Sequence, residues 1–306
     1  MNIAPGYIGI DVSKHHLDIF DGTPRRIVNS GEAIAAWIGG LGSTELVLFE
    51  ATGRYDRQLR QLLTEAGIDF ARVDPAKAHS FAKLSGRLAK TDPIDAYVLA
   101  LMAQTIKPPR HQGRSAERDR LAELHGRRDQ LVDMRQQERT RQHEATDLDA
   151  AADIAAHIDE LTTRIARFEK AITALIDSSA ELAQTNRLLR SIPGIGPVTA
   201  ATLMALLPEV GSRSPKTIAA LAGLAPFNND SGRFRGKRSI RGGRPRVRRA
   251  MYMAALATIR RPGRFAARYN AMTLLGKPPK LVLVAIARKL LVIVNAVLRD
   301  KIPFAA

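Results

Sequence analysis

The chain has 306 residues, and 45% of them are hydrophobic, which is enough to bury a sizeable core and to form two domains. It has no cysteine, which excludes disulfide bonds, zinc sites built on cysteine and catalysis by a thiol. Its formal net charge is +17, and the excess is concentrated in one part of the chain.

The distribution of this charge predicts a polyanionic partner. Residues 1–100 carry 11 basic and 12 acidic groups, and residues 101–190 carry 15 of each. Residues 211–270 carry 15 basic groups and a single acid, Asp230. An excess confined to one segment, beside a neutral one, is typical of proteins that bind nucleic acid.

The sequence predicts neither export nor membrane insertion. Its first residues lack the basic and apolar regions of a signal peptide, so we expect a cytoplasmic protein. Residues 281–298 are apolar, but Arg288 and Lys289 interrupt them. These two charges favour a packed helix over a membrane span.

Residues 1–104 alternate between short apolar runs and amphipathic stretches, which indicate strands and helices. The expected strands are residues 7–12, 16–21, 25–29, 46–49 and 69–73, and the expected helices are residues 32–38, residues 56–66 and a helical stretch from residue 75. Three closely spaced strands, followed by alternating helices and strands, is the order of elements in a ribonuclease-H-like α/β domain. We predict that fold for this segment.

Four carboxylates occur where this fold would bring them together. Asp11 ends an apolar run on the first, central strand, and Glu50 ends the fourth strand in L-V-L-F-E. Asp92 and Asp95 open the last helix in K-T-D-P-I-D-A, where their spacing of three places both on one face. Taken alone, Asp11 is equally well explained as a strand-end residue that faces solvent or caps a turn. For Asp92 and Asp95 alone, helix capping is the favoured explanation. The interpretation as one site depends on the whole set.

A cluster of four carboxylates predicts bound metal, because like charges repel at close range unless cations neutralise them. Magnesium prefers hard oxygen ligands. Phosphoryl transfer on nucleic acids often uses two divalent ions about 3.5–4 Å apart, which hold the attacking and leaving oxygens. We therefore expect Mg²⁺ at Asp11, Glu50, Asp92 and Asp95, with two ions per site.

Residues 105–185 have a helical pattern throughout, with many charges and no predicted strand. Their second half has a heptad-like apolar seam, and a weaker seam of Leu121, Leu124 and Leu131 precedes it. The residues of the main seam are Ile154, Ile158, Leu161, Ile165, Phe168, Ile172 and Leu175. The pattern predicts a helical hairpin or an intermolecular coiled coil, and an ordinary amphipathic bundle helix remains an alternative.

Residues 186–306 predict a second, mainly helical domain. A helix, the turn P-G-I-G-P at residues 193–197 and a further helix form the pattern of a helix-hairpin-helix. In that motif Gly194 and Gly196 would let backbone N–H groups approach a phosphate. The simpler alternative is a Gly/Pro connector between two helices.

Residues 231–249 are the most basic stretch of the chain, with nine basic residues, no acid and a glycine-rich, loop-like composition. We expect this basic stretch to bind nucleic-acid phosphates, whereas Phe234 alone gives weak support for base stacking. Ser231 lies within it, but residue chemistry does not distinguish Ser231 from Ser239 as a nucleophile. The basic residues are Arg233, Arg235, Lys237, Arg238, Arg241, Arg244, Arg246, Arg248 and Arg249.

Taken together, these motifs make the chain similar to transposases of insertion-sequence family one-ten, the bridge-RNA-guided serine recombinases, over nearly its whole length. Each motif is weak by itself, but their order and combination are specific. The motifs are G-I-D-V-S-K at 9–14, E-A-T-G-R-Y at 50–55, K-T-D-P-I-D-A at 90–96, I-P-G-I-G-P at 192–197, G-L-A-P at 223–226 and S-G-R-F-R-G-K with a following G-G at 231–243.

The resemblance implies three parts and a mechanism. It implies a RuvC-like domain at residues 1–104 whose metal site is Asp11, Glu50, Asp92 and Asp95, and a coiled-coil segment at residues 105–185 that helps to oligomerise the protein. It also implies a C-terminal transposase domain at residues 186–306 whose nucleophile, best matched by Ser231, forms a phosphoserine link to DNA.

The resemblance further implies the partners. These are double-stranded DNA from the element ends and the target, a structured guide RNA that pairs with both, and further copies of the chain in a dimer to tetramer with a composite site. The protein would be associated with the nucleoid when bound to DNA. One departure is that many relatives have Ser-Ser-Gly where this chain has Asp230, Ser231 and Gly232.

Three other functions fit parts of the sequence. A RuvC-like, structure-selective nuclease would need the same four acids and would use water in place of a serine. A non-catalytic nucleic-acid-binding protein would not need the complete acidic set. An actin-like ATPase also begins with a Gly-Ile-Asp strand, but its phosphate loop needs a glycine soon after the aspartate, and this chain has Val12, Ser13 and Lys14 there.

Overall fold

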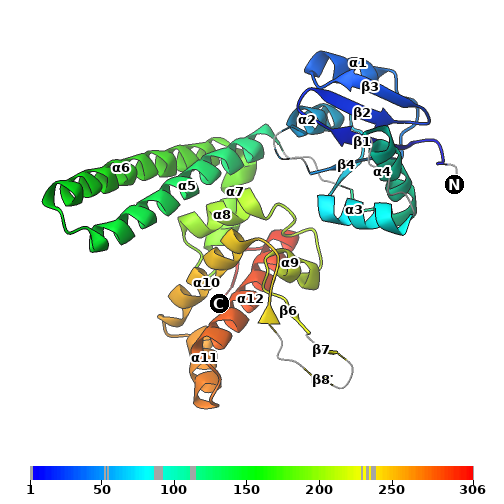
Figure 1. The fold of residues 1–306 in the computed structure, drawn as a ribbon. Helices are drawn as coiled ribbons and strands as arrows, with labels where there is room; N and C mark the ends of the chain where they lie inside the picture. Colours follow the sequence, from blue (N-terminus) through cyan, green and yellow to red (C-terminus); the bar gives the residue numbers. More distant parts are fainter. Residues whose placement is uncertain are drawn as a thin grey trace. The chain divides into compact units, whose positions relative to one another are not determined.

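The computed structural model divides the chain into two compact units, residues 1–113 and residues 114–306. Figure 1 labels the helices and strands of both units. Each unit has its own hydrophobic core. The division predicted at residues 104 and 185 is finer than this one and stays a prediction. The structure describes residues 3–51, 53, 55–85, 92–110, 115–228, 230–231, 234–235 and 239–305, with the backbone alone for residues 92–94, 230, 231, 234 and 235.

A five-stranded mixed sheet forms the centre of the first unit. Its strands are β1 (Tyr7–Val12), β2 (His16–Phe20), β3 (Pro24–Val28), β4 (Leu46–Glu50) and β5 (Phe70–Val73). Their order across the sheet is β3-β2-β1-β4-β5. The first three strands form an antiparallel meander, and β4 and β5 run parallel to β1. Each expected strand agrees with an observed one to within one residue at either end.

Helices cover both faces of this sheet. The helices are α1 (Gly31–Gly39), α2 (Arg57–Glu65), α3 (Pro75–Leu84) and α4 (Asp92–Ile106). Side chains of β1 alternate between the faces: Ile8, Ile10 and Val12 pack with α1 and α2, and the residues between them face α4. The first unit is therefore a mixed α/β domain, consistent with the predicted ribonuclease-H-like fold.

The second unit is mainly helical. Its helices are α5 (Ala116–Glu144), α6 (Leu148–Ser178), α7 (Ala180–Arg190), α8 (Pro197–Leu206), α9 (Pro215–Leu221), α10 (Pro245–Ile259), α11 (Arg264–Leu274) and α12 (Pro279–Asp300). The helix α12 passes through the core of this unit, where Leu290, Leu291 and Val294 are fully buried.

The helix α12 is long and apolar enough to cross a membrane, but half of its apolar window is buried inside the unit. Its buried Asn295 accepts a hydrogen bond from the Gly211 N–H at 2.8 Å and donates one to the Arg213 carbonyl at 3.0 Å. A buried polar side chain whose hydrogen bonds are made by a neighbouring loop of the same unit is typical of a protein core. The prediction of a packed helix at residues 281–298 is confirmed.

The predicted apolar seam lies in a helical hairpin formed by α5 and α6 (Figure 1). Leu161 and Ile165 of α6 pack on Leu131 of α5, and Phe168 packs against this cluster. The seam is therefore filled, at least at these positions, within one chain. The structure has the hairpin, and the intermolecular coiled coil is not confirmed.

Truncating the centre of the seam should destabilise this hairpin. We expect Leu161→Ala to lower the free energy of unfolding by about 2–5 kcal/mol, because Leu161 is fully buried. Urea unfolding followed by circular dichroism measures the change. The control is Leu148→Ala, at an 85% exposed position of the same helix, which should change stability by less than about 0.5 kcal/mol. Unchanged stability with a lower mass in light scattering would instead place the seam between subunits.

The basic stretch, which we expected to be a loop, takes part in two short strand pairs that begin just before it. The strands are β6 (Pro226–Phe227), β7 (Asp230–Ser231), β8 (Phe234–Arg235) and β9 (Ser239–Ile240). The strand β6 pairs with β9, and β7 pairs with β8 inside it, both antiparallel. The glycines in the sequence suggested a loop, but residues between them can pair as strands. Composition alone therefore did not predict the nested strand pairs.

Candidate active site and nucleic-acid interface

Gly9 lets the backbone of α4 lie directly against the central strand. A Cβ atom on Gly9 would fall 2.0 Å from the Ala96 carbonyl oxygen and 2.3 Å from the Ala100 nitrogen. Any larger residue would therefore displace the helix. Asp11 lies two residues after Gly9 on β1, so it shares the face that α4 covers. Asp95, the residue before Ala96, is at the start of the helix that covers this face.

Glu50 reaches the same face and the same edge of the sheet. In the parallel pair of β1 and β4, Gly9 is opposite Leu48, which packs with Leu99 of α4. Glu50 lies two residues beyond Leu48 and so points to the same side. The register also makes Asp11 and Glu50 level at the ends of their strands. The positions of three of the four predicted carboxylates thus come to one face of the sheet.

Convergence of these carboxylates on one metal pocket remains a prediction. Asp92 is the first residue of α4, but its side chain lies outside the described part of the structure. Among the side chains that are described, no group of three acidic or histidine residues is arranged to hold a metal ion. The chemistry of the donor set fits a hard divalent cation, because all four side chains offer carboxylate oxygens.

Sequence reasoning missed a fifth carboxylate on this face, Asp18. It is the partner of Asp11 in the register of β1 and β2. Its neighbour Phe20 contacts Tyr97 of α4 ring to ring, with 5.0 Å between centroids, so this side of β2 faces α4. Asp18 is only 5% exposed. The tight hairpin, with Asp11 and Asp18 at equal distances from its turn, was the signal that could have found it.

Arg26 of β3 neutralises Asp18. Its Nε donates to Asp18 Oδ1 at 2.8 Å and its Nη2 donates to Oδ2 at 3.0 Å. This two-point contact joins cross-strand partners, since Asp18 is opposite Arg26 in the register of β2 and β3. Paired, charge-assisted hydrogen bonds of this kind are the strong ones in proteins.

Ser231 lies on β7, opposite Phe234 of β8. Its side chain and those of Asp230 and Arg235 lie outside the described part of the structure, as do Arg233, Lys237 and Arg238 entirely. The roles predicted for these residues stay predictions.

Several cations assigned to nucleic acid from the sequence have partners inside the second unit. Both terminal nitrogens of Arg244 donate to the carboxylate of Glu209 at 2.6 Å. Arg248 donates to the Gly242 carbonyl at 2.8 Å, and Arg241 lies over the ring of Phe227 at 5.5 Å from its centroid. These contacts give the three arginines a structural role, in addition to any contact with nucleic acid.

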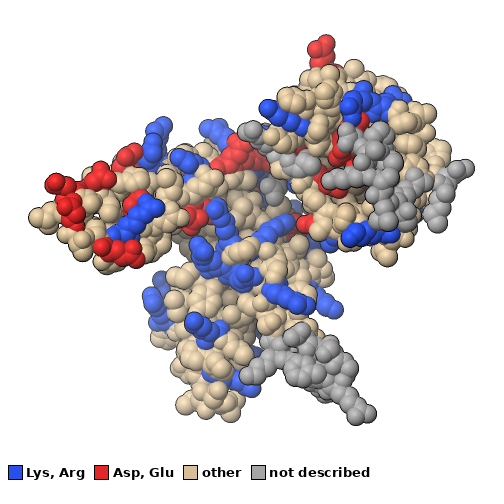
Figure 2. Space-filling view, in the orientation of Figure 1, with Lys and Arg blue, Asp and Glu red and all other residues tan. Residues whose placement is uncertain are grey.

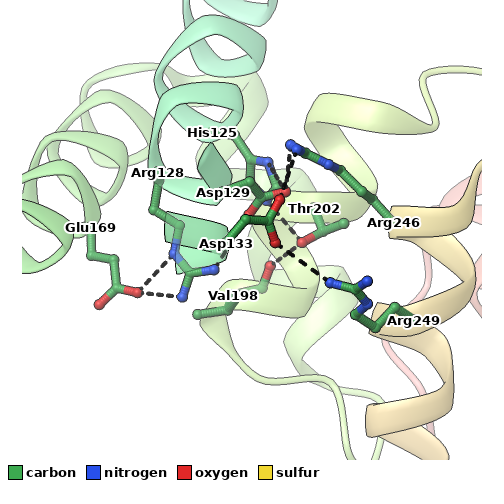
Figure 3. Close-up of polar contacts among 9 residues, drawn as sticks. All are labelled: His125, Arg128, Asp129, Asp133, Glu169, Val198, Thr202, Arg246 and Arg249. Atoms are coloured by element: carbon green, nitrogen blue, oxygen red, sulfur yellow. Dashed lines mark hydrogen bonds and ion pairs between the residues drawn. The ribbon is translucent and has the colours of Figure 1, made fainter. Parts of the chain in front are cut away.

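Two further arginines of the predicted set tie α10 to α5 (Figure 3). Arg246 Nη1 donates to Asp129 Oδ2 at 3.0 Å, and its Nη2 is 3.4 Å from Asp133 Oδ2. Arg249 is 3.7 Å from Asp133 Oδ1. Asp129 and Asp133 are one turn apart on α5, so they present both carboxylates to α10. The sequence pattern did not reveal this α5–α10 clamp, because its members are more than one hundred residues apart.

A buried histidine lies beneath the clamp. His125 Nε2 is 2.9 Å from Thr202 Oγ1, and the Thr202 hydroxyl donates to the Val198 carbonyl at 2.8 Å (Figure 3). The hydrogen between the ring and the hydroxyl therefore belongs to Nε2. Burial lowers the pKa of His125, and the negative charge of Asp129, 3.6 Å from Nδ1, opposes that shift. Since unfolding would restore an ordinary pKa, His125 should reduce stability as the pH falls below about 6.5.

The turn at residues 193–197 connects α7 and α8, and Gly194 packs against α10. A Cβ atom on Gly194 would lie 2.0 Å from Thr258 Oγ1 and 2.4 Å from the Ala254 carbonyl oxygen. Gly194 also has a φ of +81°, which favours glycine. Packing thus explains Gly194 without a phosphate, whereas a Cβ atom on Gly196 would meet open space. The helix-hairpin-helix is not confirmed, and the phosphate-binding role of both glycines stays a prediction.

The charge of the second unit is strongly one-sided. Residues 231–299 contain 18 basic residues and no acid. In Figure 2, Lys and Arg side chains spread over the region of α8, α10 and α11, whereas many of the Asp and Glu side chains in view lie along the α5–α6 hairpin. Among the acids that oppose this basic surface are Asp129 and Asp133 of the α5–α10 clamp.

Removing the acids of the clamp should strengthen DNA binding. We expect Asp129→Asn/Asp133→Asn to bind duplex DNA about three- to tenfold more tightly at low salt, with a steeper salt dependence, because Arg246 and Arg249 become available to phosphates. Fluorescence anisotropy across a salt series measures both effects. The matched control is Asp153→Asn/Asp159→Asn, two exposed acids of α6 with the same change in net charge. An equal gain in the control would show that net charge alone is responsible.

Two family models match the chain in separate regions. A model described as "Transposase", of the DEDD type, matches residues 8–148, and the model "Transposase IS116/IS110/IS902 family" matches residues 186–270. The first region contains Asp11, Glu50, Asp92 and Asp95, and the second contains Ser231.

Curated relatives match over nearly the full length. The pilin gene-inverting proteins of Moraxella lacunata and Moraxella bovis are each 32% identical over 313 residues, with 97% of this chain and 97% of the relative covered. An uncharacterised 43.6 kDa protein of insertion element IS110 from Streptomyces coelicolor is 30% identical over 141 residues, which cover 45% of this chain and 35% of that protein.

Proposed function

Because the chain belongs to the IS116/IS110/IS902 family of transposases, we propose that it cuts and rejoins DNA with a divalent-cation site on Asp11, Glu50, Asp92 and Asp95 and with Ser231 as nucleophile. The family implies a DNA substrate. The two Moraxella relatives are named as pilin gene-inverting proteins, and gene inversion supports recombination over simple cleavage.

The observation that supports the proposal is that Asp11 and Glu50 are level at the ends of neighbouring strands on the face that α4 covers, with Asp95 near the start of α4. Bound there, divalent cations would supply charge stabilisation for the phosphate oxygens. The carboxylates would hold the cations at the ends of rigid strands, which fixes a site more precisely than loops do. Gly9 contributes by letting α4, and with it Asp95, approach the sheet closely.

In the proposed reaction the Ser231 oxygen attacks the phosphorus of a DNA phosphodiester. A serine oxygen–phosphorus bond forms while the serine hydroxyl gives up its proton to solvent. The bond from phosphorus to one deoxyribose oxygen breaks, and that oxygen takes up a proton from solvent and leaves as a hydroxyl, so no net proton is consumed. Attack of a DNA hydroxyl on the phosphoserine reverses these changes and restores the serine. Breaking and rejoining then need no external energy source, because each step exchanges one phosphoester for another.

The resemblance also supports a proposal for the partners. A structured RNA would select donor and target DNA by pairing, and the basic stretch would contact phosphates of either nucleic acid. Since Ser231 and the carboxylates belong to different units, the reaction needs both units at one DNA strand. A dimer or tetramer could assemble such a composite site across subunits.

The test is formation of a covalent protein–DNA adduct. The full chain is incubated with Mg²⁺ and labelled DNA from candidate element ends, and the products are separated under denaturing conditions. The proposal requires a labelled band at the mass of protein plus DNA that is absent when EDTA is added. Cleavage without any adduct, even at the shortest times, would favour the alternative of a nuclease that uses water.

A further inference from the structure

We propose that the Asp18–Arg26 ion pair is a positioning device for the cation site: it keeps a fifth carboxylate beside Asp11 in a neutralised form and so sets the affinity of that site for divalent cations. The inference rests on the proposed function, since it concerns the same face of the sheet. It adds two residues that belong to none of the motifs behind the family resemblance.

The pair belongs to a row of charged residues that crosses the sheet. Arg26 on β3 is opposite Asp18 on β2, and Asp18 is opposite Asp11 on β1. Glu50 on β4 continues the row, because Ile10 is opposite Phe49 one residue earlier. Side chains directly opposite each other in an antiparallel pair, such as Asp18 with Arg26 and Asp18 with Asp11, have Cβ atoms about 4.5–5.5 Å apart. The register therefore gives one cationic position and then three carboxylate positions in order across one face.

Asp18 is the most deeply buried member of the row. It is almost fully buried, and both of its oxygens accept hydrogen bonds from Arg26. An unpaired carboxylate at this depth would be costly, and it would repel Asp11 directly. Arg26 removes both costs, and its two fixed donors prevent the Asp18 oxygens from turning toward a cation bound at Asp11.

A second ion pair in the same hairpin supplies a matched control. Arg25 Nε is 3.1 Å from Asp21 Oδ2, and the side chains of Arg25 and Arg26 are similarly exposed, at 49% and 52%. Asp21, however, also accepts a hydrogen bond from the indole nitrogen of Trp37 on α1. The Arg25–Asp21 pair is therefore on the opposite side of the sheet, away from the α4 face.

The inference makes opposite predictions for the two members of the pair. Arg26→Gln leaves the negative charge of Asp18 next to Asp11, so the site should bind Mn²⁺ about tenfold more tightly. Asp18→Asn leaves the positive charge of Arg26 there, so binding should weaken about tenfold. The double variant removes both charges and should return to near the wild-type affinity. Arg25→Gln should change the affinity less than about twofold.

The experiment is titration of the full-length variants with Mn²⁺, followed by calorimetry, with thermal unfolding in EDTA as the check on folding. A purely structural role of the pair would weaken binding in both single variants, and that result overturns the inference. Equal affinities in all variants also overturn it. If Asp18→Asn fails to fold, Arg26→Gln alone decides the question: tighter Mn²⁺ binding supports the inference, and weaker or unchanged binding overturns it.

The same titration separates this inference from the proposed function. Wild-type protein that binds no Mn²⁺ would remove the cation site and, with it, this inference. Wild-type binding with the wrong signs in the variants would overturn the role of Asp18 and Arg26 and leave the cation site intact.

Discussion

Replacing Asp11 with asparagine is expected to abolish DNA cleavage, with a loss of about a thousandfold or more, while DNA binding changes less than about twofold. Asparagine keeps the size of the side chain but removes the charge that a divalent cation requires, and stabilisation by such cations accounts for several kcal/mol of the barrier. The basic residues expected to hold DNA are concentrated in residues 231–299, in the other unit, so binding should survive.

The measurement is the single-turnover rate of cutting element-end DNA with Mg²⁺, together with anisotropy for binding. The control is Asp21→Asn, which removes a carboxylate that follows the neighbouring strand β2 and lies on the opposite side of the sheet. It should cut at close to the wild-type rate. If Asp11→Asn cuts DNA at the wild-type rate, the α4 face does not contain the reactive centre, and this conclusion does not depend on the effects of replacing the other carboxylates.

The sheet and the strand positions of Asp11 and Glu50 could be predicted because their signals are local. Apolar runs that end at a single carboxylate fixed β1 and β4, and the order of elements then placed Asp11 and Glu50 on neighbouring strand ends. The spacing of Asp92 and Asp95 located the start of α4. Gly9 shows the limit of this approach. A glycine is needed there because the backbone of α4, about ninety residues later in the chain, leaves no room for a side chain.

Asp18 was not predicted because its role depends on register. In the sequence it is an isolated acid in H-L-D-I-F, and strand alternation alone does not decide which face it occupies. Only the pairing of β1, β2 and β3 aligns Asp11, Asp18 and Arg26 in one row. The register of the hairpin strands is therefore what shows that Asp18 is buried and paired with Arg26.

The positive charge of the basic stretch could be predicted from the sequence, but the ion pairs that its arginines form could not. Composition located the excess of arginines, but it did not show that Arg244, Arg246 and Arg249 have acidic partners, which tertiary folding alone brings near. These partners are Glu209, Asp129 and Asp133. Pattern analysis likewise found the seam of α6 and left its partner open. Long-range pairing is the information that a local pattern lacks.

Replacing Ser231 with alanine is expected to eliminate the covalent protein–DNA adduct, so that the labelled band falls below detection, because alanine has no oxygen to form the ester with phosphorus. Divalent-cation binding should be unchanged, since it depends on carboxylates of the first unit. The steep salt dependence of DNA binding should also persist, because the change removes no positive charge. The adduct assay with Mg²⁺ and an anisotropy salt series measure these outcomes on the same protein.

The control is Ser239→Ala, a second serine of the basic stretch, which lies on β9 opposite Phe227 and is exposed. It should form the adduct at the wild-type rate, since its strand pairs through the backbone and loses little when the hydroxyl is removed. An adduct that survives Ser231→Ala and disappears in Ser239→Ala would move the nucleophile to Ser239. Cleavage that continues in Ser231→Ala without any adduct would instead make water the nucleophile, and the carboxylate site would then belong to a hydrolytic nuclease.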